Sequence, residues 1–167
     1  MSSRISNMDP IAILGLAGFS AKTGKTALDT GEMLFESAKE ARIVNQTLVS
    51  LARQARAVRD PCDLIDAYLR GIKDDLNTQP ALNRTRRGRQ FACILAAIER
   101  QLHDCEETLR RLRASTEDIR SGRPVRGTGK ALSQLNLSLS REAMNETRSQ
   151  LALHMTALNT SLQILTL

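Results

Sequence analysis

The sequence contains few of the residues that build β-sheet cores and turns. Aromatic residues make up 2% of its 167 residues, tryptophan is absent, and 4 prolines and 9 glycines are present. Sandwiches and barrels depend on aromatic and β-branched side chains and on frequent turns. Because 41% of the residues are nevertheless apolar, the core must be built from Leu, Ile, Val, Ala and Met. This composition favours helices, and the length suits one domain or a tight pair of domains.

Cysteine and histidine are scarce as well, which limits the chemistry that the chain can perform. Cys62, Cys93 and Cys105 are an odd number of cysteines and form no CxxC pair. This is typical of reduced thiols that pack as small apolar residues in a cytosolic protein. The two histidines, His103 and His154, accompany neither a nucleophile elbow nor a zinc motif. We therefore predict a cytoplasmic protein that is not an enzyme, with no cofactor and no metal site.

Long apolar runs are also missing. The sequence has no run of 18 apolar residues, whereas a helix needs about 20 of them to cross a bilayer. The stretch IAILGLAGF, from Ile11 to Phe19, is apolar but only nine residues long. It leads into an amphipathic segment, so we interpret it as the apolar tip of a longer helix.

Apolar and small residues recur at alternating steps of three and four, the spacing of a helix face that packs against other helices. The first such seam contains Leu14, Ala17, Ala21, Gly24, Leu28, Gly31, Phe35 and Ala38. The second contains Val44, Leu48, Leu51, Ala55, Val58, Cys62, Ile65, Leu69, Ile72 and Leu76. The third contains Phe91, Leu95, Ile98, Leu102, Cys105, Leu109, Leu112, Thr116 and Ile119. A last helix carries Leu137, Met144, Leu151, Met155, Leu158, Leu162 and Leu165.

Prolines and loop-forming residues separate these seams into helices. Asp9-Pro10 predicts the N-cap and first position of the first helix. Asp60-Pro61 repeats this signal inside the second seam, so we expect a kink there or a new helix beginning at residue 61. Residues 77–88 and 121–130 contain Gly, Pro and Asn or Ser, and both segments are predicted to be loops.

Long helices that each carry an apolar stripe on one side can bury those stripes only against each other. The sequence therefore predicts an all-α fold, an antiparallel bundle of four long helices. A split of the second helix at Pro61 would give five. We expect a single helical-bundle domain of residues 9–167, preceded by a flexible extension of residues 1–8.

The segment Gly24-Lys25-Thr26 looks like part of a phosphate-binding loop but lacks its spacing. Such a loop has a glycine five residues before Gly24, where this chain has Phe19, and Gly18 is one residue too early. The surrounding helical seam also replaces the strand that should precede the loop. Glycine inside a helix costs about 1 kcal/mol relative to alanine, so the glycines in this predicted helix call for an explanation other than phosphate binding. We predict close-packing positions, where helix backbones approach each other, at Ala17, Ala21, Gly24 and Gly31.

The net charge of +6 comes from the middle of the chain, since residues 84–130 hold 12 Lys and Arg against 6 Asp and Glu. The candidate patch for an anionic partner contains Arg84, Arg86, Arg87, Arg89, Arg120, Arg123, Arg126 and Lys130. Anionic lipids attract basic residues by about 1 kcal/mol each. Nucleic acid is less well supported, because no stacking aromatics and no recognised binding motif accompany the arginines. A solvated basic loop without a specific partner is the third interpretation.

Four segments resemble the fungal N-terminal domain of STAND proteins, which belongs to the HeLo-like group. They are MDPIAILGLAGFSAKTGKTALDTGEML, ARIVNQTLVSLARQARAV, LHDCEETLRRL and REAMNETRSQLALHMTALNTSLQILTL. The likeness covers roughly residues 8–166. It implies a helical bundle that acts as an effector or signalling domain of a fungal NLR-like receptor, followed by an NTPase module in a longer parent protein. The associated process is programmed cell death of the heterokaryon-incompatibility type.

The resemblance also implies that the first helix enters membranes after the domain has oligomerised. The matching residues in this sequence are Ile11, Ile13, Leu14, Leu16 and Phe19. Our first hypothesis is therefore a self-associating signalling domain that is recruited to the plasma membrane by anionic lipids. The second is an interaction or oligomerisation module without membrane activity, and the third is an arginine-driven nucleic-acid binder.

Overall fold

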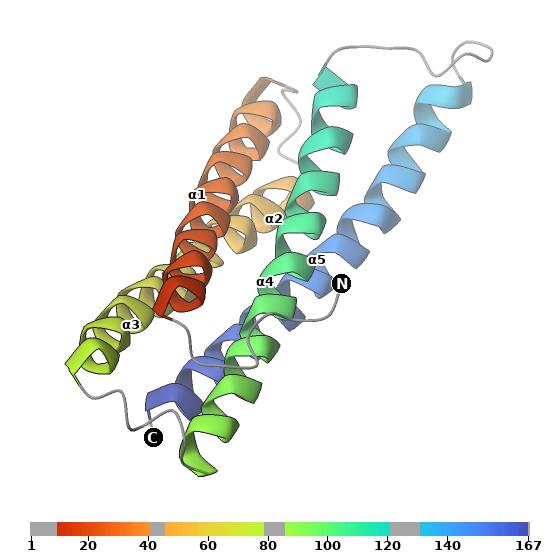
Figure 1. The fold of residues 1–167 in the computed structure, drawn as a ribbon. Helices are drawn as coiled ribbons and strands as arrows, with labels where there is room; N and C mark the ends of the chain where they lie inside the picture. The colour runs from red at the N-terminus through yellow and green to blue at the C-terminus, as the bar shows by residue number, and fades with distance from the viewer. Residues whose placement is uncertain (1–9, 41–45, 79–85, 121–130, 167) are drawn as a thin grey trace.

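The computed structural model describes residues 10–40, 46–78, 86–120 and 131–166, which are helical except at Val58. The described residues form the helices α1 (Pro10–Glu40), α2 (Gln46–Ala57), α3 (Arg59–Thr78), α4 (Arg86–Arg120) and α5 (Ala131–Thr166). Figure 1 shows that α1 and α4 run in one direction, while the α2–α3 pair and α5 run in the other. The predicted all-α antiparallel bundle is thus confirmed. The predicted start of the first helix at Pro10 is also confirmed, whereas Asp9 and the predicted extension of residues 1–8 lie outside the described part.

α2 and α3 together occupy the place of the predicted second helix. The interruption lies at Val58, and α3 begins at Arg59, so the expected boundary at Pro61 is displaced by two residues. Pro61 falls within the first turn of α3, where the missing N–H removes no helical hydrogen bond. The backbone N–H of Cys62 donates to the carbonyl of Val58 over 3.4 Å. The two short helices therefore bury one continuous apolar face.

α1 packs against α2, α3 and α4, and most extensively against α2 and α3. Alternate positions of its predicted seam are buried, and those between them are only partly buried. The fully buried Ile13 and Leu34 lie beside the seam, as do the buried Ser20, Thr23 and Thr30. A helix with three neighbours buries a face wider than one seam. The seam expected from the sequence is thus one edge of the buried face rather than its centre.

The other helices contribute large aliphatic side chains to a single core. Their fully buried members include Leu51, Ile65, Leu69, Leu95, Ile98, Leu102, Leu109, Leu151 and Leu158. All nine belong to seams that the spacing predicts. α5 closes the bundle by packing against α4, α2 and α3. The Tyr68 hydroxyl of α3 donates to the backbone carbonyl of Leu165 near the end of α5.

The first predicted loop, residues 77–88, is too long at both ends. α3 continues to Thr78 and α4 already begins at Arg86, so the arginines of this segment extend into a helix. Arginine has a good helix propensity, which suits it to the first turn of α4. Residues 79–85 and the second predicted loop, 121–130, are not among the described residues.

Candidate functional site

The five apolar residues predicted for the N-terminal tip do not form one surface. Ile11 is 77% exposed, whereas Ile13 and Leu16 are 1% and 5% exposed and belong to the core. Leu14 and Phe19 are partly buried. The Phe19 ring packs against the ring of His103 on α4, with 4.5 Å between the centroids. Only the first turn of α1 therefore presents a large apolar side chain to solvent.

Two glycines of α1 lie where the backbones of neighbouring helices come close. A Cβ atom at Gly24 would be 3.1 Å from the Cβ of Cys62. A Cβ atom at Gly31 would be 2.5 Å from the Cγ of Arg56 and 2.8 Å from the carbonyl oxygen of Ala52. Neither space admits a side chain without movement of α2 or α3. Of the two predicted alanines, Ala17 is buried and Ala21 is partly buried.

The buried face of α1 also carries hydroxyl groups, which the sequence analysis missed. Ser20 donates to the carbonyl of Cys62 on α3 over 2.8 Å, and Thr23 donates to Phe19 of its own helix over 3.0 Å. The Thr30 hydroxyl has no hydrogen-bond partner among the described residues. Together with the buried Ala27, these three residues follow the same steps of three and four as the seam. That spacing was the signal available in the sequence.

The two buried thiols are poor nucleophiles. Burial raises the pKa of both Cys62 and Cys105 to about 12, so both are protonated at neutral pH. Cys93 is exposed. Because a thiolate is the reactive form of cysteine, Cys62 and Cys105 act as small apolar residues of the core.

A polar contact joins α4 and α5 at His154. The Thr108 hydroxyl donates to the backbone carbonyl of Asp104 over 2.9 Å, so its oxygen can only accept a hydrogen bond from the His154 ring. The Nε2 atom of His154 lies 3.0 Å from that oxygen and must carry the proton. Burial lowers the pKa of His154. The histidine is therefore neutral and serves to dock α5 on α4.

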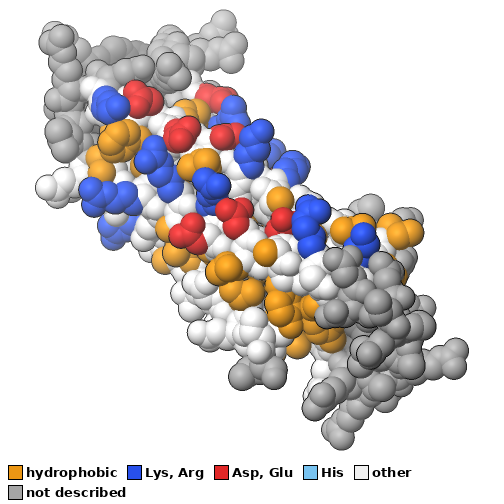
Figure 2. All heavy atoms as spheres, turned by 90° about the vertical axis from the view of Figure 1, so that its left-hand side faces the viewer, with side chains coloured by type: hydrophobic (Ala, Val, Ile, Leu, Met, Phe, Trp, Pro, Cys, Tyr) orange, Lys and Arg blue, Asp and Glu red, His pale blue; other side chains and the backbone are white. Residues whose placement is uncertain are grey.

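The predicted basic patch lies almost wholly outside the described part of the chain. Arg84, Arg123, Arg126 and Lys130 are not described, and for Arg86, Arg87, Arg89 and Arg120 only the helical backbone of α4 is described. Figure 2, which views the molecule from the left-hand side of Figure 1, shows basic and acidic side chains interspersed.

Farther along α4, basic side chains pair with acidic ones of the same helix. Arg110 and Arg111 both bind Glu107, and Arg113 binds Glu117. Hydrogen bonds from Arg110 and Arg111 lower the pKa of Glu107. This described part of α4 is therefore a face of ion pairs, with three arginines against two glutamates, and such exposed pairs contribute little to stability.

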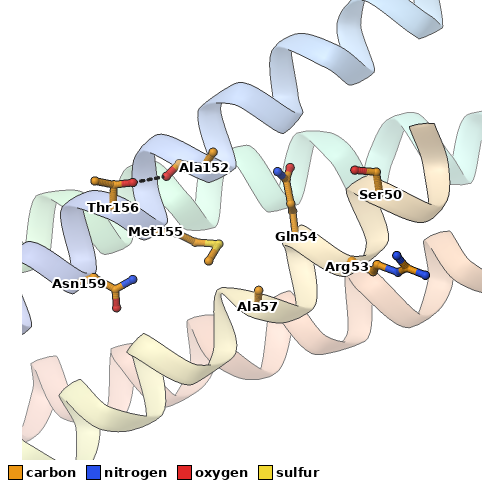
Figure 3. A pocket seen from close by; sticks show the side chains of 8 residues that line it. All are labelled: Ser50, Arg53, Gln54, Ala57, Ala152, Met155, Thr156 and Asn159. Atoms are coloured by element: carbon orange, nitrogen blue, oxygen red, sulfur yellow. Dashed lines mark hydrogen bonds between the residues drawn. The ribbon is translucent and has the colours of Figure 1, made fainter. Parts of the chain in front are cut away.

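A groove lies between α2 and α5, with a cavity volume of about 460 Å³. Ser50, Arg53 and Gln54 line it from α2, and Met155, Thr156 and Asn159 line it from α5. Figure 3 shows Gln54 and Met155 pointing into the space between the two helices. The Oε1 atom of Gln54 is buried and has no hydrogen-bond partner among the described residues. A buried acceptor without a donor is costly, so Gln54 destabilises the wall of this groove.

The described residues contain neither a cluster of metal-ligating side chains nor a membrane-spanning helix. No group of three or more His, Cys, Asp or Glu side chains in that part of the chain could hold a metal ion. No helix of the described chain is long and apolar enough to span a bilayer. Comparison with family models, curated proteins and solved structures gives no match to this chain. The likeness to the fungal STAND domains therefore rests on the four quoted segments.

Proposed function

We propose that this chain is a non-enzymatic signalling domain whose first helix targets membranes when copies of the chain assemble. The observation that carries the proposal is the exposure of Ile11, 77%, in the first turn of α1. It places a large apolar side chain at the end of a helix, with four more apolar residues behind it. The resemblance to fungal STAND domains adds the biological role, that of a cell-death effector in an NLR-like receptor that acts from the cytoplasm.

The contacts of α1 suit a helix tip that moves from the bundle to a lipid surface. Moving the tip would expose Ile13 and Leu16, at about 1.5–3 kcal/mol for each side chain, and burial of the same side chains in lipid would offset that cost. The hydrogen bond from Thr23 to Phe19 lies within α1 and would move with it. Among the described side chains of the tip, Ser20 would lose a bond to another helix.

The mode of binding follows from the length of the apolar tip. Nine helical residues extend about 14 Å, less than half of the roughly 30 Å hydrocarbon thickness. The tip therefore lies in the interfacial layer instead of crossing the membrane. Anionic headgroups would strengthen this contact through the basic residues of the chain.

The test is sedimentation of the protein with vesicles of phosphatidylcholine and phosphatidylserine, together with release of an enclosed dye. Ile11→Lys should weaken binding about tenfold or more, because it removes the burial of one large apolar side chain. Leu64→Lys on α3 is the matched control, since Leu64 is also exposed, at 55%. Ile13→Lys is unsuitable, because a lysine at this buried position would destabilise the fold.

The control variant should bind vesicles like the unmodified protein. Equal loss of binding in both variants, or no binding by the folded protein at any phosphatidylserine content, contradicts the proposal. Circular dichroism of each variant establishes that the bundle is folded.

A second function, that of a helical interaction module without membrane activity, is favoured by the groove between α2 and α5. Its lining of apolar Met155 and polar Ser50 and Asn159 suits contact with another protein surface. Light scattering distinguishes the two functions, because a pure interaction module forms the same defined oligomer with and without vesicles.

A further inference from the structure

The outer face of α5 is uncharged along its last five turns. From residue 149 to residue 167 the sequence contains no Lys, Arg, Asp or Glu. The exposed side chains of this face include Ala152, Leu153, Thr156, Asn159, Thr160 and Ile164. Leu153 is 69% exposed and Ile164 is 48% exposed, which makes them two of the four large apolar side chains exposed among the described residues. The ion pairs of α4 have no counterpart on this face.

The exposed residues of α5 follow the spacing of a second helix-packing stripe. Leu153, Thr156, Thr160 and Gln163 are separated by steps of three, four and three, and all four are exposed. Their stripe lies opposite the buried stripe that contains Leu158. An α-helix with two such stripes can pack on both sides. In the described structure only the inner stripe has neighbouring helices.

The groove between α2 and α5 adjoins this outer stripe, because Thr156 belongs to both (Figure 3). A partner that lies along the outer face of α5 would also cover the rim of the groove, where Thr156 and Asn159 are exposed. Exposed apolar side chains, stripe spacing and a neighbouring groove thus occur side by side.

The charge distribution indicates that the partner is a second copy of the same chain. In a two-fold symmetric contact, residues near the axis face their own copies, so any charge there meets a like charge. The α5 face avoids this repulsion because it carries no charge. Asn159 and Gln163 have amide side chains that both donate and accept hydrogen bonds, and the Thr160 hydroxyl, which donates to the carbonyl of Thr156, can accept one. Two identical faces of this kind can therefore satisfy each other, without a partner of opposite charge.

We propose that two copies of this chain associate through the outer faces of their α5 helices, packed antiparallel across a two-fold axis. The stripe from residue 149 to residue 166 is roughly 27 Å long, which is enough for a helix pair. This inference rests on the proposed function in one respect: the proposed function requires copies of the chain to assemble, and the α5 face is the surface through which they would do so. The face lies on α5, whereas the membrane-targeting tip lies on α1, so each can be disrupted without the other.

The first experiment is sedimentation equilibrium of the full chain, without lipid, over a concentration series that extends into the millimolar range. The Leu153→Lys/Thr156→Lys double variant should raise the dimer dissociation constant about 100-fold, because it places like charges across the axis. The matched control is Ala114→Lys/Ser115→Lys, which adds the same charge at exposed positions of α4 and should leave the dissociation constant unchanged. Thermal unfolding of each variant measures its fold stability.

A second experiment locates the contact by disulfide cross-linking. In a Cys93→Ser background, which removes the exposed thiol, Thr156→Cys should form a covalent dimer under mild oxidation. Ser115→Cys should not. A chain that is monomeric at every concentration overturns the inference, as does a dimer that is equally stable in the α5 and α4 lysine variants. Failure of the proposed function would instead appear as intact dimers that ignore vesicles.

Discussion

α1 and α5 are both long helices of the bundle, 31 and 36 residues, but they are held in it by different means. α1 is surrounded by α2, α3 and α4 and meets them with glycine, alanine and hydroxyl side chains as well as aliphatic ones. α5 meets its neighbours with leucines such as Leu151 and Leu158 and leaves one side open. Close backbone approach thus holds α1, while bulky side chains hold α5. The difference teaches that an apolar helix can depend on glycine and hydroxyl side chains for its closest contacts with its neighbours.

The largest expected effect separates Gly31, a glycine on the predicted seam of α1, from Gly18, which is not part of that seam. Gly31→Ala should lower the free energy of unfolding by about 1–3 kcal/mol, because the new Cβ would overlap the backbone of Ala52 and the side chain of Arg56. Gly18→Ala should raise it by roughly 0.5–1 kcal/mol, since no atom lies within 4 Å of the Cβ position there and alanine favours the helix. Urea denaturation measures both changes.

The opposite signs of these two effects are the critical result. If both variants were stabilised, close packing at Gly31 would not be what positions α1 against α2. The comparison between α1 and α5 would then lose its main support.

The next effect concerns the hydroxyl groups buried beside those glycines. Thr30→Val should raise the free energy of unfolding by about 1 kcal/mol, because it removes an unpartnered buried hydroxyl at constant shape. Ser20→Ala should lower it by a similar amount, since it deletes the hydrogen bond to Cys62. Thermal unfolding of the two variants provides the measurement. A destabilised Thr30→Val variant would show that this hydroxyl is satisfied after all.

The smallest effect is the pH dependence of the contact between α4 and α5. Burial lowers the pKa of His154 in the folded state, so the unfolded chain binds the proton more readily. The stability contributed by the neutral histidine is present above its unfolded pKa and is lost as the pH falls into the acidic range below about 6.5. His154→Gln should make the melting temperature less dependent on pH over this range. An unchanged slope would mean that His154 is protonated equally in both states.

Much of the fold was predictable because the apolar residues of bundle helices recur at steps of three and four. The seams of Leu51 to Leu69 and of Leu95 to Leu112 are buried where the steps of three and four place them. The proposed functional surfaces were harder to predict from the sequence. The five tip residues looked equivalent in the sequence, but the structure separates the exposed Ile11 from the buried Ile13. The buried Thr30 and the acceptor of Gln54 were missed, because polar residues at seam spacing are normally assigned to a solvent face.

The sequence by itself determined the helical class, the antiparallel arrangement and the uncharged character of the last helix. Composition and spacing are local properties, and they define which side of each helix is apolar. Only the tertiary structure decided which helices each helix contacts, how closely α2 approaches Gly31, and that no described helix packs on the outer side of α5. Spacing assigns each residue a direction on its own helix. What lies in that direction depends on how the other helices pack, and therefore on the whole chain.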